Sequence, residues 1–142
     1  MQFEVGDKAV YPAQGVAIFT GEESKKIMIP LNKLESVGLR PVIEENLVDQ
    51  VFEILRERDV KLNDQIWLRR YQSYTEKINT GSLFEVAQVL RDLILRKYEK
   101  PLSFGEQKML DQARRLVVQE LSVAKEMDKS EAEEEIEQIF RH

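Results

Sequence analysis

Residues 67–78 read WLRRYQSYTEKI, a pattern typical of an amphipathic helix. Its large apolar side chains stand at positions i, i+4, i+7 and i+11, which share one helix face: Trp67, Tyr71, Tyr74 and Ile78. Asn63 or Asp64 is suited to begin this helix, and Gly81 is suited to end it. We therefore predict a helix over residues 64–79, and the flanking segments continue the helical pattern in both directions.

Three more helices are predicted downstream, because three Ser-x-x-Glu motifs each precede an apolar periodic segment. The motifs begin at Ser82, Ser103 and Ser130, and the predicted helices span 83–98, 104–127 and a short segment after Ser130. Pro101 lies between the first two of these helices, where it interrupts neither. The apolar residues at helical spacing in them are predicted core residues: Val86, Leu90, Leu93, Leu110, Leu116 and Val117.

A further helix is predicted upstream over residues 44–58, with an apolar stripe at Leu47, Val48, Val51, Phe52 and Leu55. Residues 3–43 differ, since short runs of β-branched and aromatic residues alternate with Gly, Pro and Asp, which is typical of strands and turns. We expect positive φ angles at Gly15 and Gly21. We expect Pro30 to end a strand or to lie on a sheet edge.

These patterns predict an α+β protein with two regions. Residues 1–43 form a small β barrel or strongly bent sheet, and residues 44–142 form an all-α domain of about five helices that ends in a short acidic helix. A β module of about 40 residues without a disulfide or a metal is marginally stable alone. It must therefore pack against the helices, or residues are missing between Phe19 and Ile27.

The composition excludes several classes of enzyme. The chain has 142 residues, no cysteine and a single histidine, His142, so thiolate metal sites, cysteine nucleophiles and histidine-dependent triads are excluded. Phosphate-binding loops and hydrolase motifs are absent from the sequence, and no apolar run approaches the length of a membrane span. We therefore expect a cytoplasmic protein that is not an enzyme and has no cofactor, metal, membrane partner or small-molecule substrate.

The charge is unevenly distributed along the chain. The net charge is -5, but residues 69–115 contain ten basic and six acidic residues, whereas residues 44–68 and 116–142 are acidic. This asymmetry is compatible with one face that contacts nucleic acid and argues against a protein that binds nucleic acid over its whole surface.

Two interpretations of the Trp67 region follow from the residues. The stripe that contains Trp67 is either part of the core, or the indole projects from the first helical turn and contacts bases while Arg69 and Arg70 bind phosphates. The basic residues of the next two helices also have two interpretations, as a solvated face or as part of a DNA surface: Arg91, Arg96, Lys97, Lys108, Arg114 and Arg115.

Spaced motifs along most of the chain resemble the CarD/CdnL family of bacterial RNA polymerase-binding transcription factors, and the CdnL branch in particular. In the N-terminal region these are Phe3-x-Val5-Gly6-Asp7-x-x-Val10-Tyr11-Pro12-x-x-Gly15-Val16, Met28-Ile29-Pro30 and Val37-Gly38-Leu39-Arg40. In the helical region they are Trp67-x-Arg69-Arg70-Tyr71-x-x-Tyr74-x-Glu76-Lys77-Ile78, Thr80-Gly81-Ser82, Val89-Leu90-Arg91-Asp92-Leu93, Leu102-Ser103-Phe104-Gly105-Glu106 and Ala113-Arg114.

The resemblance implies a function and a set of site residues. It implies an N-terminal Tudor-like barrel that binds the β-subunit lobe of RNA polymerase, with Lys26, Met28 and Pro30 on the polymerase-facing strand. It also implies a helical domain that stabilises the promoter open complex by contacting the fork at the upstream edge of the bubble. The implied DNA contacts are a Trp67 wedge in the minor groove, phosphate clamps at Arg69 and Arg70, the exposed aromatic Phe104, and a basic surface with Arg91 and Arg114.

The chain departs from the family between residues 20 and 27, where family members have two further strands. We favour an incomplete sequence at this place over a natural loss, because so short a module could bury only a very small core.

Two other classes of function remain open. A polymerase-binding adapter without DNA contact would bury Trp67, and an enzyme would need a pocket with paired catalytic groups.

Overall fold

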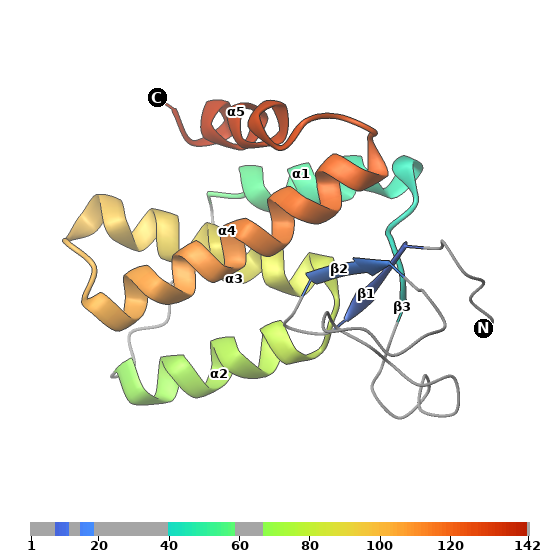
Figure 1. Cartoon of the computed structure of the whole chain (residues 1–142). Helices are drawn as coiled ribbons and strands as arrows, with labels where there is room; N and C mark the ends of the chain where they lie inside the picture. Colours follow the sequence, from blue (N-terminus) through green and yellow to red (C-terminus); the bar gives the residue numbers. More distant parts are fainter. Residues whose placement is uncertain (1–7, 12–14, 19–39, 59–66, 142) are drawn as a thin grey trace, which may run out of the picture.

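The computed structural model describes residues 8–11, 15–18, 40–58 and 67–141 (Figure 1). A small sheet lies beside a larger helical body, so the predicted α+β class, with a shortened β region ahead of an all-α region, is confirmed. The expectations for Gly21, Pro30 and the stretch between residues 20 and 27 lie outside the described residues.

Three antiparallel strands form the described part of the sheet, in the order β2-β1-β3. They are β1 (Lys8–Tyr11), β2 (Gly15–Ile18) and β3 (Arg40–Pro41). In the register of the sheet, Val10 is opposite both Val16 and Arg40. Gly15 has a φ of +99°, as the sequence predicts for this turn. Strand β3 was not predicted, because two residues that include a proline carry no strand pattern.

The described residues after the sheet contain five α-helices, in agreement with the prediction of about five. They are α1 (Val48–Arg56), preceded by a 3₁₀ turn over Glu45–Leu47, then α2 (Trp67–Asn79), α3 (Leu83–Glu99), α4 (Phe104–Ala124) and α5 (Lys129–Phe140). The predicted boundaries of α3 and α4 agree with these to within a few residues. Pro101 lies in the connection between α3 and α4, as predicted.

The three predicted capping boxes differ in outcome. At the start of α4, the Ser103 hydroxyl accepts a hydrogen bond from the Glu106 amide, and the Glu106 carboxylate accepts one from the Ser103 amide. Ser82 is the N-cap of α3, but its side chain makes no capping hydrogen bond. The prediction for Ser130 is wrong, because α5 begins at Lys129 and Asp128 is the residue that precedes it.

The hydrophobic core lies between the helices, with α3 packed against α1, α2 and α4. Every core residue predicted in α3 and α4 is buried, and so are four of the five residues of the predicted α1 stripe, Leu47 being half-buried. Each buried aliphatic side chain contributes roughly 1.5–3 kcal/mol of transfer free energy. The core thus fixes the arrangement of the helices that present the exposed residues described below.

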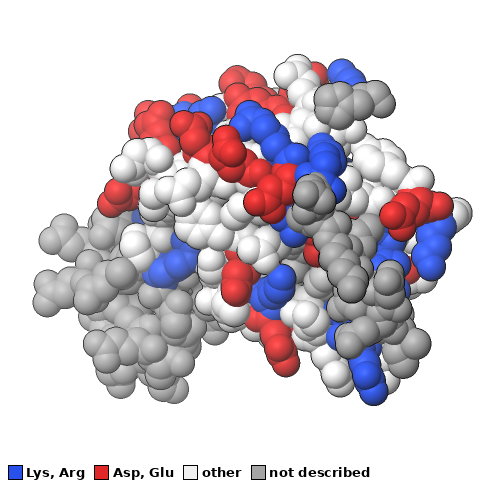
Figure 2. Space-filling model, turned by 180° about the vertical axis from the view of Figure 1, so that it is seen from behind, with Lys and Arg blue, Asp and Glu red and all other residues white. Residues whose placement is uncertain are grey.

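Helix α5 closes the molecule on the side of α1 and α4 (Figure 1). Its apolar residues Ala132, Ile136 and Phe140 recur every four positions and are buried. Two side chains hold its C-terminal end: the Tyr98 hydroxyl donates to the Phe140 carbonyl, and Arg58 donates to the Ile139 carbonyl, each at 2.7 Å. Seen from behind, acidic side chains gather along the upper edge of the molecule, where α5 lies (Figure 2).

The sheet packs against α4. The Gln119 side-chain amide exchanges two hydrogen bonds with the Val16 backbone, and the Glu120 carboxylate pairs with Arg40 of β3. A β region this short is marginally stable alone, and these contacts with α4 add to its stability. Ala9 and Val10 of β1 are both buried, and Val10 lies on the side of the sheet that faces the helices.

Candidate nucleic-acid interface

The beginnings of α2 and α4 lie against each other at the end of the molecule far from the sheet (Figure 1). Trp67 is the first residue of α2, and its indole packs on Gly105 in the first turn of α4. A Cβ atom at position 105 would lie only 3.2 Å from the indole nitrogen. Glycine at this position therefore permits the close approach of the tryptophan to the α4 backbone.

Two neighbours from α2 hold the indole in place. The Arg70 guanidinium carbon lies 5.1 Å from the centre of the Trp67 ring, within the range of a cation–π interaction. The Tyr71 ring meets it edge-on, with the ring centres 5.7 Å apart and an angle of 72° between the planes. Trp67 is half-buried in this setting. Part of the indole is packed and part is open to solvent. Trp67 is therefore neither a fully buried core residue nor a freely projecting side chain.

Arg70 is directed into the protein. Its Nη1 donates to the Glu106 carboxylate at 2.8 Å, and both side chains are buried. Burial alone would raise the pKa of Glu106, but hydrogen bonds from Arg70 and Ser103 outweigh it and hold that pKa below its ordinary value. A buried pair of this kind depends on both partners, because either charge left alone would lack compensation. Arg70 thus joins the start of α2 to the start of α4.

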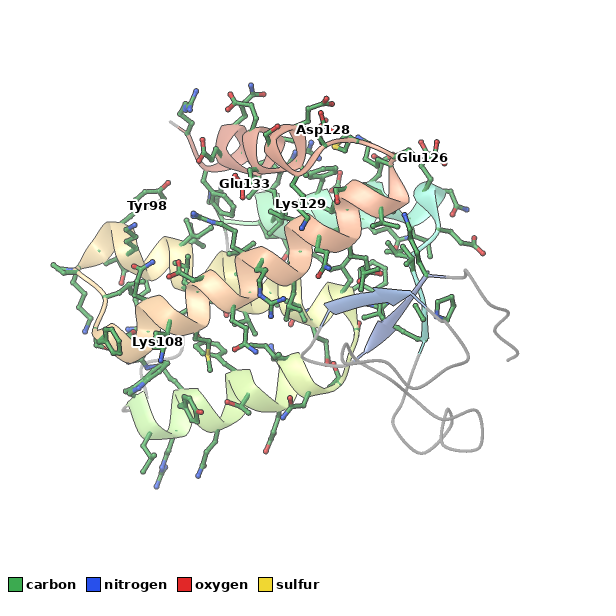
Figure 3. The ribbon with its side chains drawn as sticks, in the orientation of Figure 1. Tyr98, Lys108, Glu126, Asp128, Lys129 and Glu133 are labelled. Carbon is green, nitrogen blue, oxygen red and sulfur yellow. The ribbon has the colours of Figure 1, made fainter. Side chains whose placement is uncertain are left out.

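Several large side chains remain exposed around Trp67. Phe104 is 81% exposed, Leu68 is 64% exposed and Tyr71 is 47% exposed. Arg69 is exposed beside them, and the Lys108 ammonium lies 5.3 Å from the centre of the Phe104 ring. We call Trp67, Leu68, Tyr71 and Phe104, with the cations Arg69 and Lys108, the aromatic end. Figure 3 shows Lys108 near the beginning of α4, away from Lys129 and Glu133 of α5.

An aromatic surface with adjacent cations suits a nucleic acid. Bases stack on exposed aromatic rings, and cations next to the rings bind the phosphates of the same strand. Single exposed apolar residues are common on protein surfaces, but several grouped at one place indicate a contact with a partner. The aromatic end has both features.

The remaining basic residues predicted for this surface lie elsewhere. Arg91 is buried on α3, where it bonds Glu57 at 2.7 Å and Asp92 at 3.0 Å. Burial raises the pKa of Asp92, and the neighbouring Arg91 partly offsets that shift. Arg114 lies ten positions beyond Phe104 on α4, which is about 15 Å along the helix, and it lines a groove with Tyr98 and Arg141. The structure groups Trp67, Arg69, Arg70 and Phe104, but not Arg91 or Arg114.

Lys26, Met28 and Pro30, the residues predicted to contact polymerase, lie outside the described residues. The predictions for these three positions stay predictions.

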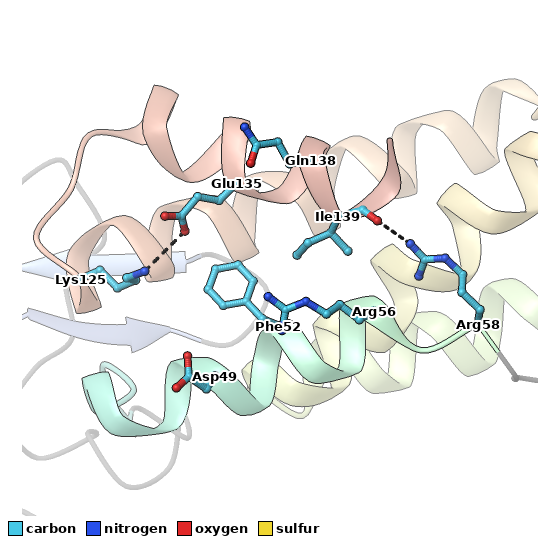
Figure 4. A pocket seen from close by; sticks show the side chains of 8 residues that line it. All are labelled: Asp49, Phe52, Arg56, Arg58, Lys125, Glu135, Gln138 and Ile139. Atoms are coloured by element: carbon cyan, nitrogen blue, oxygen red, sulfur yellow. Dashed lines mark hydrogen bonds and ion pairs between the residues drawn. The ribbon is translucent and has the colours of Figure 1, made fainter. Parts of the chain in front are cut away.

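A pocket of about 640 Å³ lies between α1 and α5 (Figure 4). Two of its cations are already engaged: Arg58 donates to the carbonyls of Leu55 and Ile139, and Lys125 pairs with Glu135 at 3.5 Å.

Within the described ranges, no cluster of His, Cys, Asp or Glu could hold a metal ion. Nor does any helix there have the length and apolarity to cross a membrane.

The sequence argument missed the supporting residues Gly105 and Glu106, and it treated Tyr71 only as a candidate core residue. One signal was available, since a glycine inside a predicted helix costs about 1 kcal/mol relative to alanine and usually has a packing reason. The partner of Arg70 is 36 residues away, and only the folded chain brings the two together.

Comparisons with known proteins identify this architecture. The family described as "CarD, C-terminal domain" matches residues 50–137, so the helical body is a CarD C-terminal domain. A Bacillus subtilis (strain 168) protein named "Putative transcription factor YdeB" is 33% identical to this chain over 144 residues, covering 87% of this chain and 92% of the relative. The chain therefore belongs to the CarD family, a family of transcription factors rather than of enzymes.

The comparison also bears on the length of the chain. The 87% of this 142-residue chain that is aligned amounts to about 124 residues, whereas the alignment spans 144. The relative thus has about 20 residues without a counterpart in this chain. Within the aligned region this chain is therefore shorter than that relative.

Proposed function

We propose that this CarD-type transcription factor binds promoter DNA through its aromatic end while its N-terminal region binds the β subunit of RNA polymerase, and that it thereby stabilises the open complex. The observation that carries the DNA contact is the grouping of Trp67 and Phe104 with the cations Arg69 and Lys108. The polymerase contact rests on the motifs of residues 3–43 and on the family. This activity belongs in the cytoplasm, at the nucleoid to which polymerase is bound.

Trp67 is the wedge in this proposal. Its indole is fixed on one side by Gly105 and Arg70, so the exposed part is held rigidly toward the DNA. A rigid aromatic edge fits the minor groove at a base step that has already opened, as at the fork of the bubble. Phe104 offers a second, more exposed ring for the unpaired bases next to the fork.

The two arginines of α2 take different roles. Arg69 is exposed and is the phosphate contact. Arg70 is a positioning residue, because its buried pair with Glu106 and its place over the indole fix Trp67. Arg91 and Arg114 remain proposed members of a wider basic surface, and the engagement of Arg91 with Glu57 and Asp92 makes Arg114 the better candidate.

Stabilisation of the open complex follows from differential affinity. A protein that binds the open promoter more tightly than the closed one shifts the equilibrium toward the open form by the ratio of the two affinities. A wedge that fits only an opened step supplies that ratio. The net charge of -5 is compatible with this function, because attachment to polymerase raises the local concentration at the DNA and makes tight free binding unnecessary.

The decisive experiment measures open-complex lifetime on a ribosomal-RNA-type promoter with bacterial polymerase, using the unchanged protein and Trp67→Ala. We expect the unchanged protein to extend the lifetime and Trp67→Ala to remove most of the extension. Phe84→Ala is the matched control, because Phe84 is also a half-buried aromatic at the first turn of a helix, and it should keep the effect.

Two outcomes would contradict the proposal. If Trp67→Ala lost the roughly 3–5 kcal/mol of unfolding free energy typical of a buried aromatic, Trp67 would be a core residue. If the unchanged protein bound the polymerase β lobe without any effect on lifetime, it would be an adapter without DNA contact.

A further inference from the structure

Helix α4 makes specific contacts at both of its ends. At its N-terminal end, Gly105 supports the Trp67 indole and Glu106 pairs with Arg70. At its C-terminal end, Gln119 and Glu120 hold the sheet. We call Gln119 and Glu120 the sheet anchor. One continuous helix thus contacts both the sheet, which belongs to the proposed polymerase-binding region, and the aromatic end, which is the proposed DNA contact.

Both carboxylate oxygens of Glu120 are used. Oε1 and Oε2 accept from the two terminal nitrogens of Arg40 at 2.6 and 2.7 Å, and Oε2 also accepts from the Ile43 amide at 2.8 Å. Arg40 Nε donates in addition to the Gly81 carbonyl, at the turn between α2 and α3. The Glu120 side chain is only 3% exposed and that of Arg40 is 26% exposed, so the carboxylate side of this bidentate pair is shielded from solvent.

Gln119 adds a second, independent contact. Its side-chain amide accepts from the Val16 amide at 3.2 Å and donates to the Val16 carbonyl at 3.3 Å, as a neighbouring strand would. Gly15 leaves the space for it, since a Cβ atom there would lie 2.3 Å from the Gln119 oxygen. The cavity that remains between sheet and helices is about 20 Å³, close to the volume of a single water site.

The length of α4 sets the distance between the two ends. Fourteen positions separate Glu106 from Glu120, and a rise of 1.5 Å per residue makes this about 21 Å. Both ends of α4 are joined to their neighbours by packed side chains and hydrogen bonds rather than by a flexible linker. The sheet and the aromatic end are therefore held at one spacing and one rotation about the α4 axis.

We propose that Gln119 and Glu120 are positioning residues that fix the N-terminal region relative to the aromatic end, so that a chain bound to polymerase presents Trp67 at a single place on the DNA. This inference rests on the proposed function. Rigid connection of two binding sites avoids the entropic cost of ordering them on binding and raises the effective concentration of the second site.

The first test measures the connection itself. The chain contains no cysteine, so a cysteine pair introduced at the exposed positions Lys8 and Gln72 can carry two spin labels. We expect a narrow distance distribution in the otherwise unchanged protein, and a distribution at least twice as broad in Arg40→Ala and in Gln119→Ala. Gln107→Ala is the matched control, since it makes the same change on the same helix outside the anchor and should leave the width unchanged.

The second test measures binding with unlabelled proteins. Arg40→Ala and Gln119→Ala should bind polymerase alone, and fork-junction DNA alone, within twofold of the unchanged protein. Their affinity for the polymerase–promoter complex should fall about tenfold, because the effective concentration is lost. Arg40→Ala leaves α4 unaltered, and Gln119→Ala leaves the Arg40–Glu120 pair intact, so circular dichroism should show a fully helical protein in both.

The outcomes separate this inference from the proposed function. If the unchanged protein bound neither polymerase nor fork DNA, the proposed function and the role assigned to the anchor would both fail, even with narrow distances. If it bound both, and the two anchor variants kept narrow distances or full affinity for the complex, the inference alone would be overturned.

Discussion

At the residue scale, the start of α2 shows how two adjacent arginines acquire different environments. Arg69 is exposed, whereas Arg70 is buried against Glu106 and lies over the Trp67 ring. Successive residues on a helix are about 100° apart, so one arginine can face solvent while the next faces the neighbouring helix. This difference in burial leads directly to opposite expectations for their removal.

Arg69→Ala should flatten the salt dependence of fork-DNA binding, because each lost phosphate contact lowers the log–log slope by about 0.7–0.9. Arg70→Ala should instead lower the unfolding free energy by about 3 kcal/mol, because it leaves Glu106 buried without its partner. Fluorescence titrations at several salt concentrations, together with urea unfolding, measure both quantities. An unchanged slope for Arg69→Ala would argue against a phosphate contact there.

Glu106→Gln should show a pH-dependent loss of stability. The pKa of Glu106 is lowered in the folded protein from its ordinary value of 4.5, so the ionised pair stabilises the fold above about pH 4.5. This contribution is lost as the pH falls through the lowered pKa. The difference in unfolding free energy between wild type and variant should therefore be about 3 kcal/mol at pH 7 and clearly smaller at pH 3, measured by urea unfolding. A difference that grew toward pH 3 would contradict this assignment.

The candidate site could be predicted in part from single residues. Trp67, Arg69, Arg70 and Phe104 were singled out from the sequence because they match a family motif, but Arg70 was assigned the same phosphate contact as Arg69 and is instead buried against Glu106. The support of Trp67 by Gly105 and Glu106 could not be predicted, since it arises from a contact between helices that are distant in sequence.

At the element scale, the helix starts differ in how their first amides are satisfied. The Ser103 side chain caps α4, whereas the side chain of Ser82, at the same position of α3, makes no capping bond. Helix starts with the same sequence motif therefore contribute unequally to stability.

Ser103→Ala should lower the unfolding free energy by about 1 kcal/mol, the usual value of an N-cap hydrogen bond. Ser82→Ala should change it by less than about 0.5 kcal/mol, because no side-chain bond is removed. Parallel urea unfolding of the two variants compares them directly. Equal losses would mean that the capping geometry does not determine the contribution of these serines.

The elements could be predicted where the pattern is long. Helices α3 and α4 have many turns with buried residues at regular spacing, and their predicted limits were nearly correct. Strand β3 consists of two residues and carries no such pattern. The start of α5 was misplaced because a Ser-x-x-Glu motif resembles a capping box even where another residue, here Asp128, precedes the helix.

At the scale of the whole molecule, the acidic face of α5 lies away from the aromatic end. Helix α5 exposes Glu131, Glu133, Glu134 and Glu137, and lies on the opposite side of the body from α2 (Figure 1). The acidic residues of α5 would repel phosphates, so DNA bound at the aromatic end is expected to approach from the side of α2. The charge division along the sequence is only partly kept in space, because Arg114 and Arg115 of α4 line a pocket with Glu133 of α5.

A fragment of residues 44–142 should fold without the sheet. Among the described residues, the members of the buried core cluster all lie between Val48 and Phe140. Loss of the sheet uncovers Leu116 and leaves Glu120 without Arg40, so the unfolding free energy should fall by a few kcal/mol. Circular dichroism and urea unfolding should still show a cooperative transition. A fragment without one would mean that the sheet is part of the folding unit.

The two ends of α4 also restrict how the gene for this protein can change in length. A residue inserted between Glu106 and Gln119 would turn one end of the helix by about 100° relative to the other and move Trp67 away from the orientation fixed by the sheet. Insertions in the connections between helices have no such effect. Among descendants of this sequence, we therefore expect length differences to accumulate in the connections, while α4 keeps the same number of residues between its two contacts.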